Sequence, residues 1–187
     1  MEALATYLRE AGKLAESDIA AFLELGQLKT FQKGDYLIRE GQICQEAGFV
    51  QSGIFRSFYF TQNSEEVTYC FTFAPNLISA YSSYITGRPS PENIQALTEA
   101  EVWLFPKTGL EALMAQNPAW LWFSKHLAEQ QYLEMEQRIF LLQKESAETR
   151  YAHLQREQPQ LLQHIPLQYL ASYLGITQRH LSRLRKA

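Results

Sequence analysis

The stretch from Ala119 to about Gln155 contains neither glycine nor proline, the two residues that most often end a helix. This composition predicts a long helix. Within it, apolar residues recur with the 4-3-4-3 spacing of a heptad seam, at Ala128, Tyr132, Met135, Ile139 and Leu142. Such a seam predicts that the helix pairs with a second copy of itself.

A second apolar stripe on this helix consists of Leu133, Phe140 and Leu141, which are expected to pack on a region of strands earlier in the chain. The alternative is that both stripes belong to the core of one monomer. Because a helix of this length buries one stripe on its own domain, two stripes favour a dimer.

The segment from Ile165 to Lys186 predicts two short helices joined by a tight turn. Pro166 suits the first turn of a helix, Gly175 suits a reversal with positive φ, and Thr177 suits the N-cap of the second helix. The apolar positions that would pack the two helices together are Leu167, Leu170, Ala171, Leu174, Ile176, Leu181 and Leu184.

The second of these helices is polar and basic on its outer face, with Gln178, Arg179, Ser182, Arg183 and Lys186. This combination is typical of a helix-turn-helix that reads DNA. The alternative is an ordinary helical hairpin whose charged face is solvated.

Charge is divided unevenly along the chain. The 187 residues carry a net charge of −3, but residues 150–187 hold six basic residues and one acid, Glu157. The first 149 residues therefore carry −8 and the last 38 carry +5. A basic end on an acidic body is expected where that end meets phosphates.

Between Leu28 and Phe105 the pattern changes to short strands separated by turn residues, as in an antiparallel sandwich or jelly roll. Strands are predicted at 54–61, 67–73, 93–97 and 101–105, a short helix at 76–86 and a loop at 87–91. In the strand at 67–73, apolar Val and aromatic residues alternate with Thr and Cys, which predicts a half-buried strand.

The remaining helices are predicted at 2–25 (two short helices), 110–114 and 146–157. Together these elements predict an α+β fold with an N-terminal jelly roll, a long dimerisation helix and a C-terminal helix-turn-helix. The predicted domains are a sensor at 1–118, the dimerisation helix at 119–145 and the DNA-binding domain at 146–187.

Only two cysteines occur, Cys44 and Cys70, too few for an iron–sulfur or zinc cluster built from this chain alone. No signal peptide or membrane-spanning run is visible, so a cytoplasmic protein without cofactor or metal is expected. A cupin-like metalloenzyme would need histidines in the strand region, and haem would need an axial ligand. A cupin-like site is not expected, because all four histidines lie outside the strands, at His126, His153, His164 and His180. No nucleophile–base pair or Gly-rich phosphate loop stands out either, so the chain is not expected to be an enzyme.

This order of elements resembles the Crp/Fnr family of bacterial transcription regulators, the relatives of the catabolite activator protein. The most specific part is IPLQYLASYLGITQRHLSRLRK, which is similar to short-tailed members of the family. SAETRYAHL resembles the segment that leads from the hinge into the next helix. GDYLIREG and FVQSGIFRSFY are similar to the second strand and the strand–Gly–strand pattern of the family.

The resemblance implies roles for the second helix of the helix-turn-helix. Gln178, Arg179 and Arg183 would meet base edges, because Arg can donate two parallel hydrogen bonds to guanine and Gln can pair with adenine. The residues that would hold phosphates are Thr177, Ser182, Arg185 and Lys186. No β-hairpin wing follows this helix in the sequence, which predicts fewer phosphate contacts.

The sequence departs from the family at the cyclic-nucleotide phosphate cassette. The positions of the family's Gly-Glu and Arg-Ser hold Ser79-Ala80 and Ser90-Pro91, so neither the ribose-binding carboxylate nor the phosphate-binding arginine is present. A buried phosphate diester without a matched cation is disfavoured, and no response to cyclic AMP is expected. The residues expected around a less charged ligand, or around a filled interior, are Ser79, Ala80, Tyr81, Arg88, Ser90, Met135 and Glu136.

The function predicted from the resemblance is a homodimeric regulator that binds a near-palindromic operator. Its implied partners are double-stranded DNA, a second copy, RNA polymerase and a small-molecule effector, with no membrane. The alternative is a ligand-sensing or protein-interaction module whose helix-turn-helix is not functional.

Overall fold

The computed structural model describes residues 1–10 and 13–186. The chain forms two compact units. Unit 1 contains Met1–Tyr59 and Phe71–Leu127, and unit 2 contains Phe60–Cys70 and Ala128–Ala187. The chain therefore crosses between the units after Tyr59, Cys70 and Leu127.

Unit 1 begins with two short helices, α1 (Glu2–Glu10) and α2 (Glu16–Glu24), as predicted. Helix α2 starts one residue before the Ser17-Asp18 pair that predicted it. The reason is a local hydrogen bond, in which the Asp18 carboxylate accepts from the backbone N–H of Ala15 at 3.1 Å. This contact supports the N-terminal end of the helix.

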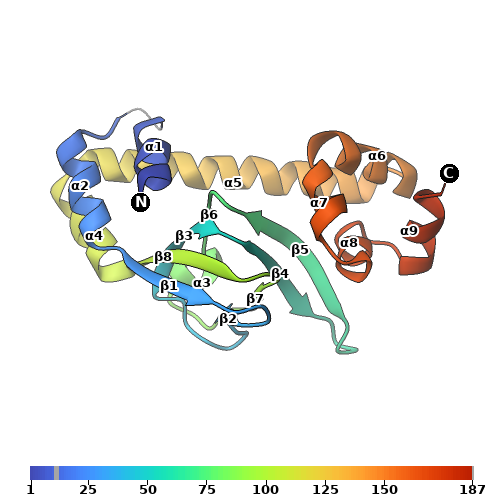
Figure 1. Cartoon of the computed structure of the whole chain (residues 1–187). Coiled ribbons are helices and arrows are strands. Elements are labelled where there is room, and N and C mark those ends of the chain that lie inside the picture. The colour runs from blue at the N-terminus through green and yellow to red at the C-terminus, as the bar shows by residue number, and fades with distance from the viewer. Residues whose placement is uncertain (11–12, 187) are drawn as a thin grey trace. The chain divides into compact units, whose positions relative to one another are not determined.

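Two four-stranded sheets form the body of unit 1 and confirm the predicted sandwich (Figure 1). The first sheet has the order β1 (Gln27–Phe31), β8 (Ala100–Pro106), β3 (Glu46–Ser52), β6 (Asn76–Ile78). The second has the order β2 (Tyr36–Ile38), β7 (Asn93–Ala96), β4 (Ile54–Phe60), β5 (Glu66–Phe73). Most neighbouring strands within a sheet are distant in sequence, because the chain passes repeatedly from one sheet to the other.

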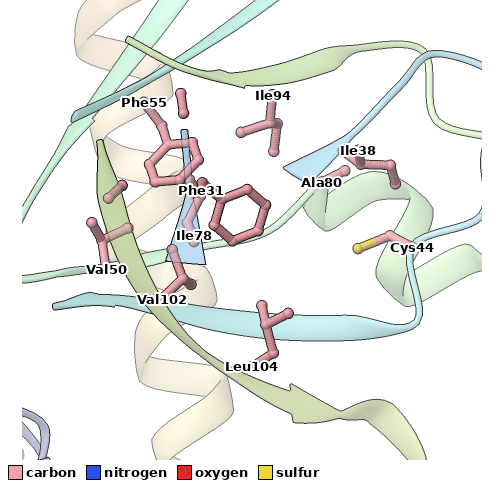
Figure 2. Close-up of a cluster of buried hydrophobic side chains, with 12 residues drawn as sticks. Phe31, Ile38, Cys44, Val50, Phe55, Ile78, Ala80, Ile94, Val102 and Leu104 are labelled. Atoms are coloured by element: carbon pink, nitrogen blue, oxygen red, sulfur yellow. The ribbon is translucent and has the colours of Figure 1, made fainter. Parts of the chain in front are cut away.

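Apolar side chains from both sheets meet in a buried cluster (Figure 2). Gly48 on β3 is required here, because an added Cβ would lie 2.8 Å from the Ile78 side chain. Burial of each large side chain contributes roughly 1.5–3 kcal/mol. The cluster consists of Phe31, Ile38, Cys44, Val50, Phe55, Ile78, Ala80, Ile94, Ala96, Ala100, Val102 and Leu104.

A second cluster joins α1 and α2 to β8, α4 (Lys107–Gln116) and the start of α5 (Pro118–Lys144). Its centre is Phe22, whose ring lies 4.4 Å from that of Phe105 and 5.0 Å from that of Trp120 between centroids. Trp120 and Phe123 are the two buried residues of α5. The first turns of the long helix are thus held by aromatic packing.

Two details of the strand region differ from the sequence predictions. The segment 76–86 was predicted as one helix, but it begins as strand β6 and only Tyr81–Thr86 forms helix α3. Strand β5 exists as predicted, yet its buried side chains are Thr68 and Thr72, whereas the apolar side chains between them are only partly covered. Alternation identified the strand but not its buried face.

Unit 2 contains the rest of α5, the tip of the β4–β5 hairpin and four shorter helices. These helices are α6 (Ala147–Glu157), α7 (Pro159–His164), α8 (Leu167–Tyr173) and α9 (Gln178–Leu184). No helix among the described residues is both long enough and apolar enough to span a bilayer.

The stretch without glycine or proline, predicted as helical to about Gln155, is divided after Lys144, close to the boundary predicted between 119–145 and 146–157. Ser146 is the N-cap of α6, and its hydroxyl accepts from the N–H of Thr149 at 3.2 Å. On the other side of the break, the Arg150 guanidinium donates to the carbonyls of Leu142 (3.3 Å) and Glu145 (2.8 Å). These bonds satisfy backbone groups at both helix ends, so the break needs neither glycine nor proline.

Candidate nucleic-acid interface

The turn between α8 and α9 ends the first helix in a left-handed residue. Gly175 has φ +66°, its N–H donates to Ser172 at 3.0 Å, and the N–H of Ile176 donates to Ala171 at 3.0 Å. This pair of bonds is a Schellman motif, in which glycine avoids the strain that a side chain would meet at positive φ. The predicted role of Gly175 is confirmed.

Helix α9 begins at a side-chain cap and packs through one buried leucine. The Thr177 hydroxyl accepts from the N–H of His180 at 3.2 Å, as its predicted N-cap role requires. Leu181 is fully buried, whereas Leu184, which was predicted to face inward, is partly exposed. Burial of Leu170, Ala171 and Leu174 on the other helix completes the packing.

The residues predicted to contact DNA lie on or beside the outer face of α9. Thr177, Gln178, Arg179 and Arg183 are exposed, and Ser182 is partly exposed. Arg185 and Lys186 follow the last turn of the helix and are also exposed. Their positions are compatible with contact to a nucleic acid, and their contacts with DNA stay a prediction.

The six basic residues between Arg150 and Lys186 differ in whether their side chains have a partner within the chain. Arg150 is used at the break between α5 and α6, and Arg156 pairs with Glu157 at 2.6 Å. Within the described part of the chain, no ion pair or hydrogen bond involves the other four side chains, Arg179, Arg183, Arg185 and Lys186. These four cations are available to an external anion.

His180 on α9 faces a carboxylate of the neighbouring helix α6. Its Nε2 lies 3.6 Å from Oε1 of Glu148, an ion pair when the imidazole is protonated. The pKa of Glu148 is held below its ordinary value, first by its own backbone N–H, then by the Ser146 hydroxyl and His180. Glu148 therefore stays ionised near neutral pH beside the first turn of α9.

The predicted dimer seam is largely open in the single chain. Tyr132, Ile139 and Leu142 are 65%, 49% and 37% exposed, and Ala128 and Met135 are partly covered. The second stripe, which was predicted to be packed on the strand region, is exposed at Leu133 (47%) and Phe140 (46%). Packing of this stripe on the strand region would join the two units, so it stays a prediction.

The residues predicted to surround a ligand do not form a uniform set. Ala80 is completely buried in the core cluster, where Figure 2 shows it pointing among the labelled side chains. The Ser90 hydroxyl is buried and donates to the carbonyl of Glu92 at 2.9 Å. Tyr81 and Arg88 are exposed and Ser79 is partly buried, while the remaining two residues, Met135 and Glu136, belong to α5 in unit 2.

Several buried polar residues of unit 1 were not identified from the sequence. Arg56 on β4 is 1% exposed, donates to Gln95 at 3.3 Å and stacks 3.9 Å from the centre of the Phe58 ring. The Ser83 hydroxyl accepts from the N–H of Cys44 at 3.0 Å and donates to the carbonyl of Arg88. Only Arg56 could have been noticed in the sequence, because it is a charged residue within the apolar run of β4. Among the described residues, no group of three or more His, Cys, Asp or Glu could hold a metal ion.

Residues 28–117 match the family described as the cyclic nucleotide-binding domain. This match covers the sandwich of unit 1 and helix α4. No curated protein matches the chain at a significant level.

Three solved structures show the same arrangement of elements at low sequence identity. FixK2 from Bradyrhizobium japonicum is 15% identical, over 86% of this chain and 83% of that chain, with a TM-score of 0.78. The c-di-GMP responsive global regulator CLP from Xanthomonas campestris is 15% identical, over 92% and 90% of the chains, with a TM-score of 0.73. A regulator from Eubacterium rectale assigned to the Crp/Fnr family is 15% identical, over 92% and 82%, with a TM-score of 0.73. The fold of this chain is therefore the one that Crp/Fnr regulators adopt.

Proposed function

We propose that this chain is a DNA-binding transcription regulator of the Crp/Fnr type, which binds a near-palindromic operator as a homodimer. The observation that carries the proposal is the set of four cations on and after α9 that have no partner within the described chain. The N-cap of α9 and the left-handed glycine that ends α8 support a helix-turn-helix that reads DNA. The fold shared with known regulators supports the same conclusion.

Dimerisation is proposed from the exposed seam on α5. Tyr132, Ile139 and Leu142 repeat at heptad spacing and would lose their exposed apolar surface against a second copy. Two-fold symmetry would then present two copies of α9 to successive major grooves, about one helical turn of DNA apart.

We also propose that the chain does not respond to cyclic AMP. At the place of the phosphate-binding arginine, the chain has Ser90, whose hydroxyl is buried and bonded to the backbone of Glu92. A neutral, internally bonded side chain does not offset the cost of burying a phosphate diester. An effector, if the sensor has one, would carry less charge.

The test is a titration of the purified chain with genomic DNA fragments, followed by the same titration at increasing salt. We expect the chain to select a palindromic fragment and to bind it as a dimer. For each phosphate contact, the logarithm of the binding constant should fall by about 0.9 for every tenfold increase in salt concentration. Flat salt dependence, or no preference over random DNA, would contradict the proposal. In that case the favoured alternative is a protein-interaction module whose helix-turn-helix is not functional.

A further inference from the structure

The hairpin tip of unit 2 provides an open strand edge. Strand β5 is the last strand of its sheet, with β4 on one side only. Backbone groups two residues apart on a strand point to the same side, so the Glu66 carbonyl and the Thr68 N–H can face that open edge together. An edge of this kind normally bonds another strand, a covering element or water.

A single serine of α8 satisfies both groups. The Ser172 hydroxyl accepts from the Thr68 N–H at 2.9 Å and donates to the Glu66 carbonyl at 3.1 Å. A serine hydroxyl has one donor and two acceptor positions, so both bonds can exist at once. The contact depends on the backbone of the hairpin and not on its side chains.

Tyr173, the next residue of α8, is bonded to helix α5. The Arg138 guanidinium of α5 donates to the Tyr173 carbonyl at 2.8 Å and lies 3.8 Å from the centre of the Tyr173 ring. Consecutive residues of the first helix of the helix-turn-helix are therefore bonded to a strand edge and to the long helix. Thr68, whose N–H bonds to Ser172, is 1% exposed, so that bond is shielded from water.

We propose that Ser172 and Arg138 are positioning residues, which fix α8 to the edge of β5 and to α5 and thereby set the orientation of α9 for DNA. This inference rests on the proposed function, since the oriented helix is the one proposed to enter the groove. Neither residue touches DNA in this scheme. By fixing α8 before DNA binds, they reduce the conformational entropy that the two helices lose on binding.

The first experiment measures hydrogen exchange in the full-length chain without DNA. Ser172→Ala removes the acceptor of the Thr68 N–H, so we expect that amide and its neighbours in the hairpin to exchange about tenfold faster. Ser172→Thr, which keeps the hydroxyl, should restore slow exchange. Ser82→Ala, at an exposed serine of α3, is the matched control and should leave the hairpin unchanged. Unchanged exchange at Thr68 in Ser172→Ala would overturn the inference.

The second experiment measures the salt dependence of DNA binding by the same variants and by Arg138→Ala and Arg138→Lys. We expect Ser172→Ala and Arg138→Ala to weaken binding about five- to tenfold without changing the salt slope, because no phosphate contact is removed. Arg138→Lys should recover part of the loss, since its ammonium can still donate to the Tyr173 carbonyl. A reduced slope, or unchanged affinity despite faster exchange, would overturn the positioning role.

The two proposals fail in different ways. If the unmodified chain binds no DNA, the proposed function is wrong. Exchange at Thr68 would then still decide whether Ser172 holds the hairpin to α8.

Discussion

At the scale of single residues, internal partners divide the basic residues near the C-terminal end into structural and available ones. Arg150 and Arg156 donate to groups of their own unit, and each bond lowers the attraction that the cation can offer to an external phosphate. Arg179 and Arg183 have exposed side chains on the first two turns of α9. Formal charge alone does not make this distinction, because all four residues are arginine.

The first prediction concerns these arginines. We expect Arg179→Ala and Arg183→Ala each to weaken specific DNA binding by roughly 1–3 kcal/mol, the worth of a bidentate base contact. Fluorescence anisotropy with an operator fragment measures the loss. Arg156→Ala is the matched control, because its guanidinium pairs with Glu157, and it should bind nearly as well as the unmodified chain. Equal losses in all three variants would mean that α9 has no special role.

The second prediction concerns Tyr84. Burial, followed by the nearby Glu111 carboxylate, raises the pKa of Tyr84 from 10.0 to about 12. The folded chain therefore retains the phenol proton more strongly than the unfolded chain does. The resulting stability is present below pH 10 and is lost as pH rises from about 10 to 12.

Denaturant unfolding over that pH range, with tyrosinate absorbance as the spectroscopic signal, tests this prediction. Tyr84→Phe should reduce the fall in unfolding free energy, whereas Tyr81→Phe, which removes only the smallest contribution to the raised pKa of Tyr84, should reduce it much less. An identical pH profile for both variants would show that Tyr84 is not the group responsible.

At the scale of elements, α5 changes character along its length. Its start is held by Trp120 and Phe123, whereas none of its residues after Leu127 is fully buried. The exposed apolar residues that follow have the spacing of a coiled-coil seam. Exposed apolar side chains along the second half of a helix are expected when another molecule covers that surface.

The third prediction therefore concerns Ile139, which is 49% exposed at the centre of the seam. Ile139→Glu should convert the proposed dimer to a monomer, because two carboxylates would face each other in an apolar interface. Sedimentation velocity measures the oligomeric state, and binding to the palindromic operator should fall with it. Gln137→Glu adds the same charge to the other side of the helix and should leave the dimer intact. A monomeric unmodified chain would contradict the prediction outright.

The elements show what could be predicted from the sequence. Local chemistry predicted Gly175 and Thr177 correctly, because a positive φ and an N-cap depend on a few neighbouring residues. Packing between distant segments was not predictable in this way. The buried threonines of β5 and the burial of Arg56 on β4 depend on which surfaces meet, and alternation does not contain that information.

The candidate site was predicted in the same uneven manner. The outer face of α9 followed from helical period alone, since Leu181 fixes the inward direction. Ser172 and Arg138 gave no signal, because their partners are the backbone of a hairpin about a hundred residues away and the carbonyl of Tyr173. Side-chain bonds to a distant backbone leave no pattern in the sequence.

At the scale of the whole molecule, the sandwich shares its fold with known regulators, and Ser90 occupies the position at which a phosphate-binding arginine is expected. The fourth prediction is that cyclic AMP does not raise the thermal unfolding temperature of the chain. A ligand at one hundred times its dissociation constant adds about 2.7 kcal/mol to stability, which calorimetry detects readily. A saturable increase in the unfolding temperature would contradict the prediction and place a phosphate-binding group elsewhere in the sandwich.

The two units share strands β4 and β5, which begin in one unit and end in the other. Unit 2, which contains the proposed DNA-binding helix, is consequently discontinuous in sequence, and no single cut of the polypeptide can release it intact. A fragment that starts at Ala128 would lack residues 60–70 and leave Ser172 without its backbone partners. Exchange of unit 2 between proteins of this fold would have to include residues 60–70 as well, because recombination at one junction would separate Ser172 from its backbone partners.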